Sequence, residues 1–291
     1  MTRLADIEAH IGSMGELRDI VGAMRSLAGM RVQEAHRSLP GIRRYAATMA
    51  AAIGAALLLV PEGAPAARSA PGRRAIILCT TEHGFVGAFN ERILAAAEAV
   101  LNPEDVLFIL GSRGVALAQE RGRPAAWAHP MATRPQSVPE TIRRLTAELY
   151  RAVADGEVTR VETIFARHHQ SGPLEIEQRL LFPVDRAAFA LARPGMPPLH
   201  NLPAEVLLER LIADYVFALM TEAAVESLAS ENAARFAAMG SAHDNVSKKL
   251  EQLRQDARQA RQSEITTELL DLVTGAEAQH DADPRHREAQ R

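Results

Sequence analysis

The chain has 291 residues, enough for one large or two small domains with a hydrophobic core. Its formal net charge of −3 argues against a protein whose main partner is nucleic acid. A single cysteine, Cys79, excludes an internal disulfide and a zinc site built from several cysteines. Because Cys79 lies in the apolar run AIILCT, we expect it to be a small buried side chain rather than a nucleophile.

Residues 1–60 are predicted to form a long helix that takes part in a coiled coil. Apolar residues recur at steps of three and four between Leu4 and Leu27, which places them on one stripe of a helix. The pattern resumes after Pro40, where we expect a kink or a break. The amphipathic, acid-containing start does not resemble a signal peptide, and the longest apolar run, residues 49–60, is too short to span a bilayer. We therefore expect a soluble chain with no direct membrane insertion.

Residues 61–74 are rich in proline, glycine and alanine and are predicted to be a linker. Residues 75–200 then alternate between short apolar runs typical of strands and longer patterns typical of helices. The predicted strands lie at 75–81, 105–111, 125–131, 160–168 and 174–182, and the predicted helices at 90–101, 112–122 and 139–156. This alternation predicts a small open α/β sheet, followed by a second linker at 192–203.

The stretch TTEHGFVGAFN after the first predicted strand resembles loops that hold phosphate groups. Its glycines, Gly84 and Gly87, stand in a G-x-x-G spacing without the lysine of a P-loop, and Glu82 would repel an anion. We interpret the loop as a tight strand-to-helix turn, in which the glycines permit close packing and Asn90 is the N-cap of the next helix.

The residues also predict neither a cofactor nor a metal site nor a catalytic set. The adjacent His168 and His169 would point to opposite faces of a strand, so they are not expected to bind one ion.

The C-terminal part is predicted to be one long helix, because residues 204–274 contain no proline and a single glycine, Gly240. At about 1.5 Å per residue it would extend roughly 105 Å, which is too long for one domain of this size to bury. Its residues at steps of four and three form the seam of a coiled coil: Val246, Leu250, Leu253, Ala257 and Ala260. The two chain ends are therefore predicted to wind into an antiparallel coiled coil around an inserted α/β domain. We place the end of this helix near residue 278 and expect the polar residues 279–291 to be disordered.

The C-terminal block resembles the gamma subunit of F-type ATP synthases. The matching residues are Met239, Ala242, Asn245, Arg261, Gln262, Ile265, Thr266, Glu268, Leu269, Gly275 and Ala276. Ala23 and Met24 match the N-terminal helix of that family, and the stretches CTTEHGFVGAFN and FILGSRGVALAQERG resemble its first two strand regions. The chain departs from the family in a first helix that is neutral rather than lysine-rich, and in its polar tail.

The resemblance implies a Rossmann-like α/β domain inserted into the coiled coil, and a central-stalk rotor that couples ion-driven rotation to ATP synthesis or hydrolysis in surrounding subunits. It implies a chain that is not catalytic alone and that binds the alpha and beta subunits of the head, the epsilon subunit and the membrane c-ring. The complex would place it peripherally on the cytoplasmic side of the bacterial inner membrane. The residues implied to contact the catalytic ring are Arg261, Gln262, Thr266, Glu268 and Met24.

The residues alone leave other interpretations open. Arg261 and Gln262 could belong to an ordinary solvated helix face, and Met24 could be a seam residue. Residues 248–261 carry five basic and two acidic side chains, which fits either a helix surface or a basic collar that passes acidic loops. For the whole chain, the alternatives are a stand-alone α/β ligand-binding protein with coiled-coil dimerisation arms, or a structural scaffold.

Overall fold

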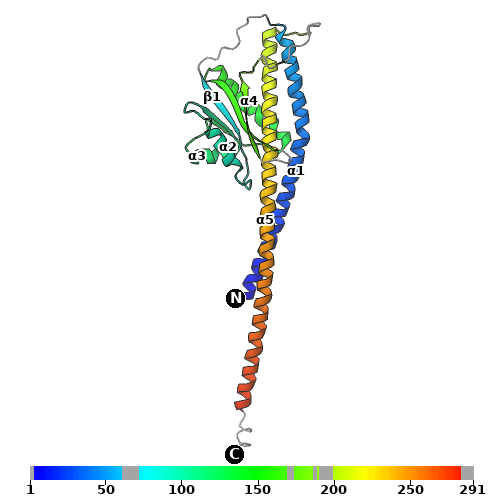
Figure 1. Ribbon diagram of the computed structural model, residues 1–291, viewed down its shortest axis with the longest axis vertical. Coiled ribbons are helices and arrows are strands. Elements are labelled where there is room, and N and C mark those ends of the chain that lie inside the picture. Colours follow the sequence, from blue (N-terminus) through cyan, green and yellow to red (C-terminus); the bar gives the residue numbers. More distant parts are fainter. Residues whose placement is uncertain (1–2, 61–71, 169–173, 186–188, 190–198, 283–291) are drawn as a thin grey trace, which may run out of the picture. The chain divides into compact units, whose positions relative to one another are not determined.

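A computed structural model describes residues 3–60, 72–168, 174–185, 189 and 199–282 (Figure 1). The elements in chain order are α1 (Arg3–Leu57), β1 (Arg73–Cys79), α2 (Phe89–Glu98), β2 (Val106–Leu110), α3 (Ser112–Glu120), β3 (Trp127–His129), the 3-10 turn η1 (Pro135–Ser137), α4 (Val138–Ala154), β4 (Val158–Arg167), β5 (Glu175–Phe182) and α5 (Ala204–Ala282). The predicted strands and helices of the α/β region are all present, with ends that differ by a few residues.

The strands form one five-stranded sheet in the order β3-β2-β1-β4-β5. β1 pairs in parallel with both β2 and β4, and β2 pairs in parallel with β3. β5 is antiparallel to β4, so one edge of the otherwise parallel sheet is reversed. The predicted open α/β sheet is thereby confirmed, and the chain reverses direction across the sheet between β1 and β4.

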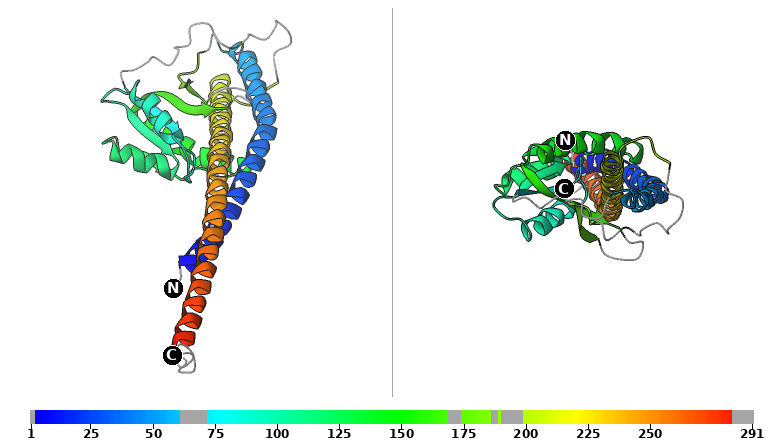
Figure 2. Two further views of the ribbon diagram at one scale, coloured as in Figure 1. Left: turned by 60° about the horizontal axis from the view of Figure 1, so that its bottom comes forward. Right: turned by 90° about the horizontal axis from the view of Figure 1, so that it is seen from above.

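Helices cover both faces of this sheet. Because successive strand residues point to opposite faces, Ile76 and Leu78 of β1 pack with α2 and α3, whereas Ile77 packs with α4 and with segments of α1 and α5. Figure 2 allows both layers to be followed from two further directions. The second face is the more heavily covered, since three helices contribute to its core.

Contacts divide the chain into two compact units, residues 25–238 and residues 1–24 with 239–291. The sheet thus shares a unit with the helix segments 25–57 and 204–238, which the sequence had assigned to separate helical regions. These segments pack against the sheet through buried side chains such as Leu39, Val216 and Leu228, and this packing explains the different division.

Ion pairs join α1, α5 and β5 within the unit that contains the sheet. Glu222 of α5 accepts hydrogen bonds from Arg43 Nε of α1 at 2.8 Å and from Arg179 Nη1 of β5 at 2.9 Å. Arg43 also pairs with Glu226, one turn further along α5. Burial alone raises the pKa of Glu222, but the hydrogen bonds from Arg43 and Arg179 outweigh burial and lower it. The carboxylate is therefore charged and bridges two helices and a strand.

In the smaller unit, α1 and α5 run antiparallel along a coiled-coil seam. A Cβ placed on Gly22 would lie 3.7 Å from His243 Cδ2, and Glu8 accepts a hydrogen bond from Arg261 Nη2 at 2.6 Å. Leu250 and Leu253 are buried, and the other predicted seam residues of α5 are half-buried. The predicted antiparallel seam is confirmed.

The structure decides two details of the predicted first helix: it is not broken at Pro40, one of the two outcomes expected there, and its buried stripe is narrower than predicted. α1 continues through Pro40, because the flanking Leu39 and Ala46 are buried and this packing holds the helix together despite the lost hydrogen bond. Leu17 and Leu27 are 41% and 43% exposed, so they lie outside the buried part of the predicted stripe.

Several predicted boundaries also shift. β1 begins at Arg73, inside the predicted linker, and α5 continues to Ala282, into the predicted tail. The rest of both linkers and of the tail lies largely outside the described residues. Within the described ranges, no helix combines the length and the apolar character that crossing a membrane requires.

Leu228→Ala should lower the free energy of unfolding of the sheet-containing unit by about 2–5 kcal/mol, because Leu228 is 2% exposed and its truncation leaves a cavity. Leu269→Ala is the matched control, since Leu269 lies on the same helix but is 57% exposed, and we expect a change within about 0.5 kcal/mol. Urea unfolding followed by the fluorescence of Trp127, the single tryptophan, measures both. Equal losses in the two variants would contradict the packing of α5 described above.

Candidate functional site

The loop after β1 is held by the carboxylate of Glu82. Its oxygens accept hydrogen bonds from Ser112 N at 3.1 Å, Ser112 Oγ at 2.7 Å and Met131 N at 3.0 Å. Burial by itself raises the pKa of Glu82, but these hydrogen bonds outweigh burial and lower it. Because Ser112 begins α3, the chain's own carboxylate occupies the N-terminus of that helix, a position that favours anions.

α5 covers the carboxyl ends of the two central strands. Ser227 Oγ donates to the carbonyl of Cys79 at the end of β1 at 2.8 Å, and Ser230 Oγ donates to Ala166 O near the end of β4 at 2.9 Å. In open α/β sheets, ligands bind outside the carboxyl ends of the strands where the chain reverses its order, which here is between β1 and β4. The usual ligand position is therefore filled by a helix of the same chain.

Arg235 and Glu231 extend this packing along α5. The Arg235 guanidinium donates to the carbonyls of His83 and Gly84, each at 3.3 Å, and to Glu231 Oε1 at 2.6 Å. Burial raises the pKa of Glu231 to about 7, while the nearby Arg235 opposes that rise. The sequence analysis did not single out either residue. A run of polar residues within a proline-free helix, SENAARF, was the signal that could have pointed to them.

The two glycines of the loop have different geometries. Gly87 has φ 58°, in the left-handed region that favours glycine, whereas Gly84 is not among the residues with positive φ. A Cβ on Gly84 would lie 3.3 Å from Arg113 Nη2, so a side chain there would crowd the start of α3. Phe85 also has a positive φ, 63°, and is 67% exposed at the tip of the loop.

The expectation that Asn90 caps the next helix is wrong. The N-cap of α2 is Ala88, and Asn90 lies inside the helix, where it is buried. Its side chain instead accepts a hydrogen bond from Thr81 N at 3.1 Å and donates one to Thr81 Oγ1 at 2.9 Å. Asn90 therefore fixes the start of the loop to α2. The sequence pattern of a helix cap does not predict that Asn90 is buried, because this burial depends on tertiary packing.

The buried Cys79 agrees with the structural interpretation of its strand. The side chain is 2% exposed, and burial raises the pKa of its thiol to about 12. The thiolate is therefore strongly disfavoured at neutral pH.

Of the residues that the family resemblance implied as ring contacts, four lie together on α5. Arg261, Gln262, Thr266 and Glu268 are all exposed. Arg261 forms an ion pair with Glu8 of α1, in which the two side chains are 63% and 49% exposed. The hydroxyl of Thr266 donates to the carbonyl of Gln262, one turn back, at 2.8 Å.

Met24 lies away from the four exposed residues of α5 that the family resemblance implied as ring contacts. It is half-buried on α1, 16 residues beyond Glu8, the residue that pairs with Arg261. At about 1.5 Å per residue, that separation is roughly 24 Å along the helix. Any surface that includes all five residues would have to extend over several helical turns.

The sequence analysis did not identify an apolar stripe near the end of α5. The exposed residues are Ile265, Leu269, Leu270, Leu272 and Val273, each between 51% and 70% exposed. α1 begins at Arg3, and Glu8 of α1 pairs with Arg261 of α5. Because the two helices are antiparallel, almost no residues of α1 lie opposite the apolar stripe, which follows Arg261 on α5. Counting residues along the predicted seam could have indicated that the last turns of α5 extend beyond the start of the first helix and have no partner residues in it.

Glu82→Gln should lower the free energy of unfolding by about 1–2 kcal/mol at pH 7, because a neutral amide keeps the contacts but loses charge-assisted hydrogen bonding. The pKa of Glu82 is lowered from its ordinary value of 4.5, so the charged form stabilises the fold above that pH and the contribution is lost as the pH falls below it. The difference between wild type and variant should therefore shrink in acid.

Urea unfolding at pH 7 and at pH 4, followed through Trp127, tests this prediction. Glu120→Gln, an exposed glutamate at the other end of α3, is the control and should show no such difference. A Glu82→Gln effect that grows in acid would show that the carboxylate is not held as described.

A family model described as ATP synthase matches residues 3–279. The chain is 31% identical over 293 residues to an ATP synthase gamma chain of Thermobifida fusca (strain YX), which covers 92% of this chain and 94% of that relative. It is 26% identical to the ATP synthase gamma chain of Prosthecochloris aestuarii, over 96% of this chain and 99% of the relative. Both relatives are bacterial proteins of nearly the same extent.

Solved structures agree at the level of the fold. A chain of the Euglena gracilis mitochondrial ATP synthase, OSCP/F1/c-ring, aligns with a TM-score of 0.65 at 13% identity and covers 97% of this chain and 96% of its own length. A chain of the Tetrahymena thermophila mitochondrial ATP synthase central stalk and c-ring aligns with a TM-score of 0.56 at 16% identity. The alignment covers 77% of this chain and 99% of that chain. The family match and the gamma-chain relatives span nearly the whole sequence. The chain belongs to the ATP synthase gamma-chain family and is a non-catalytic, central-stalk subunit of the membrane-associated F-type ATP synthase.

Proposed function

We propose that the last turns of α5 are the part of this subunit that lies within the ring of alpha and beta subunits. The observation that supports this proposal is the exposed apolar stripe of α5, which includes Ile265, Leu269 and Leu272. Removing apolar side chains from water is favourable by about 25 cal/mol per Å² of apolar surface that another surface covers. A ring of neighbouring subunits supplies such a surface on all sides, whereas a single partner helix would cover only one face.

Next to this stripe, Arg261 and Gln262 form the polar part of the proposed contact. The ion pair of Arg261 with Glu8 is exposed on both sides, and such pairs contribute only about 0–1 kcal/mol. Arg261 can therefore exchange Glu8 for a carboxylate of a partner at little cost, and its planar guanidinium can bind that carboxylate through two hydrogen bonds. Thr266 and Glu268 would extend the same surface, and Met24 would contact the ring at a separate level.

Selective contacts of this kind account for coupling. A rotor residue changes the state of a neighbouring subunit only if it binds one conformation of that subunit better than another. Rotation of α5 would present Arg261 and Gln262 to each catalytic subunit in turn and favour a different conformation at each angle. The ion-driven rotation of the c-ring and the synthesis or hydrolysis of ATP in the head would be coupled in this way.

The remaining proposed partners are the epsilon subunit and the c-ring, which we assign to the unit that contains the sheet. The relatives are bacterial gamma chains, and on this basis we place the subunit peripherally on the cytoplasmic side of the inner membrane. The exposed basic side chains of residues 248–261 would form the collar that passes acidic loops of the ring.

Arg261→Ala combined with Gln262→Ala should leave assembly intact but lower the rotation-coupled ATP turnover of the complex several-fold or more. The expected size follows from charge-assisted hydrogen bonds, which contribute about 1.5–3 kcal/mol each when shielded. Alanine is a good helix former, so α5 itself should persist. Co-purification with the alpha and beta subunits measures assembly, and ATP hydrolysis by the purified complex measures turnover.

The chain offers a closely matched control on the same helix. Arg254 and Gln255 form the same dipeptide two turns earlier, and both are exposed. Arg254→Ala with Gln255→Ala removes the same chemical groups and the same charge from the proposed collar, but both residues lie outside the positions that match the family, so we expect a smaller effect on turnover. Turnover at the wild-type rate in the Arg261 and Gln262 variant would mean that these residues are only solvated surface, and an equal loss in both variants would mean that they make no contact beyond the charge of the collar.

A further inference from the structure

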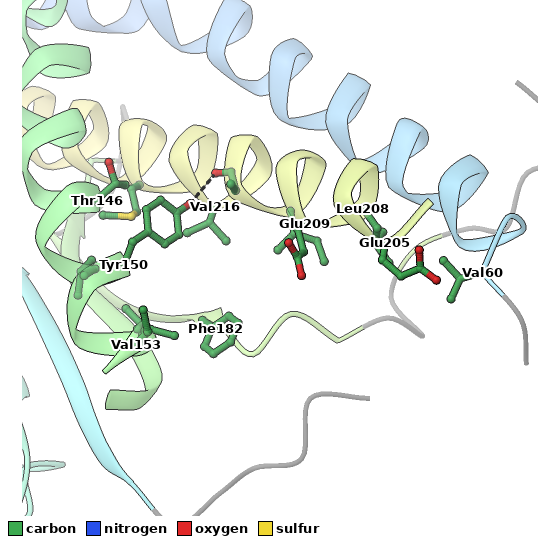
Figure 3. Close-up of a pocket in the computed structure, with 15 residues that line it drawn as sticks. Val60, Thr146, Tyr150, Val153, Phe182, Glu205, Leu208, Glu209 and Val216 are labelled. Carbon is green, nitrogen blue, oxygen red and sulfur yellow. Dashed lines mark hydrogen bonds between the residues drawn. The ribbon is translucent and has the colours of Figure 1, made fainter. Parts of the chain in front are cut away.

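A cavity of about 780 Å³ lies between α4, the first turns of α5 and the end of β5 (Figure 3). Its walls are mainly apolar, with side chains such as Leu149, Val153, Phe182 and Val216. The volume is within the range of roughly 300–1,000 Å³ that small-molecule sites occupy. None of the described residues that line the cavity belongs to the loop after β1 or to the proposed ring contacts.

The hydroxyl groups in the cavity are already used by the protein. Tyr150 Oη donates to Ala213 O at 3.3 Å, and Thr146 Oγ1 lies 2.9 Å from the carbonyls of both Ile142 and Arg143. Burial, followed by the nearby Asp214 carboxylate, raises the pKa of Tyr150, so its hydroxyl stays neutral at physiological pH. These groups contribute polarity to the wall but no free charge.

Two carboxylates supply the charge. Glu205 and Glu209 are one turn apart on α5, and Figure 3 shows them toward the Val60 end of the cavity, whereas Tyr150 and Val153 lie at the other end. Neither glutamate has a hydrogen-bond or ion-pair partner within the part of the chain that the structure describes. No lysine or arginine is among the described residues that line the cavity. Among the described residues, the lining of the cavity therefore combines an apolar body with two carboxylates and no basic side chain.

We propose that this cavity is a binding site for an amphipathic organic cation, with the apolar part of the ligand between Val153, Phe182 and Val216 and its ammonium group beside Glu205 and Glu209. Transfer of the apolar part out of water favours binding, and so does the attraction of the ammonium group to the two carboxylates. An anion of the same shape is repelled by those carboxylates, and a neutral molecule gains only from apolar burial. This proposal is independent of the ring contacts, because it uses other residues and another surface.

Three ligands that share a ten-carbon chain test the proposal: n-decylammonium, n-decanol and n-decanoate. Titration calorimetry with the full chain, below the micelle concentrations of the two ionic ligands and below the solubility limit of decanol, should show saturable binding of decylammonium about five- to tenfold tighter than that of decanol. Decanoate should bind most weakly. Equal affinities for decylammonium and decanol, or no saturable binding of decylammonium, would overturn the proposal.

Two variants assign the binding to this cavity. Glu205→Gln with Glu209→Gln changes exposed side chains, so the fold should persist, and the preference for decylammonium over decanol should disappear while decanol still binds. Val153→Trp fills the apolar part and should weaken decylammonium and decanol at least tenfold, roughly as expected for a lost apolar site. A preference that survives the glutamate variant, or binding that survives Val153→Trp in a chain with unchanged circular dichroism, would contradict the assignment.

A charge-matched control separates this site from general attraction to an acidic chain. Asp244→Asn with Glu251→Gln removes two exposed carboxylates from another part of α5 and changes the net charge by the same amount. We expect decylammonium to bind this variant as it binds the wild type. An equal loss in both double variants would mean that only net charge attracts the ligand, and would overturn the site.

Discussion

The burial of residues 221–230 of α5 against the sheet is the constraint on which the rest of the larger unit depends. All ten of these residues are buried, although the segment contains two serines, a threonine and two glutamates. A buried polar group without a partner costs free energy, so each of these side chains requires a partner at a defined position. The carbonyls of Cys79 and Ala166 accept from the serines, and Arg43 and Arg179 pair with Glu222. These requirements fix α5 in one position along the strands.

The same constraint explains why a sheet that resembles those of nucleotide-binding proteins serves as a structural element. α5 occupies the carboxyl ends of β1 and β4, and Glu82 occupies the N-terminus of α3. The carboxyl ends of the strands at this point of the sheet are where such folds usually hold a ligand, and a helix N-terminus favours anions. The carbonyls of Cys79 and Ala166, at the ends of β1 and β4, accept hydrogen bonds from the subunit's own helix. The loop after β1 is held by Glu82, Asn90 and Arg235 rather than by a phosphate.

Along its length, α5 passes through three environments. Residues 221–230 are buried on all sides, residues 246–260 are buried along one stripe, and residues 265–274 are exposed on all sides. The first environment requires polar partners inside the fold, and the second requires a partner helix. For the third we propose a partner from outside the chain, because exposed apolar residues are stabilised when another surface covers them. A single continuous helix thus contributes to the core and to the coiled coil, and its last turns are the proposed docking segment.

Much of this organisation follows from the sequence alone, because it rests on local periodicity. Strand and helix alternation and the seam through Leu250 and Leu253 depend on the spacing of apolar residues, and the start of α5 at Ala204 follows from the proline-free stretch after the second linker; both signals are visible in any single chain. The family resemblance also rests on local motifs. What the tertiary structure alone decided depends on contacts between distant residues: the continuity of α1 through Pro40, the bond of Asn90 to Thr81, the burial of Glu231 and the pairing of Arg261 with Glu8. Periodicity shows which face of a helix is apolar, but the partners of buried polar groups are set by packing between segments far apart in the sequence.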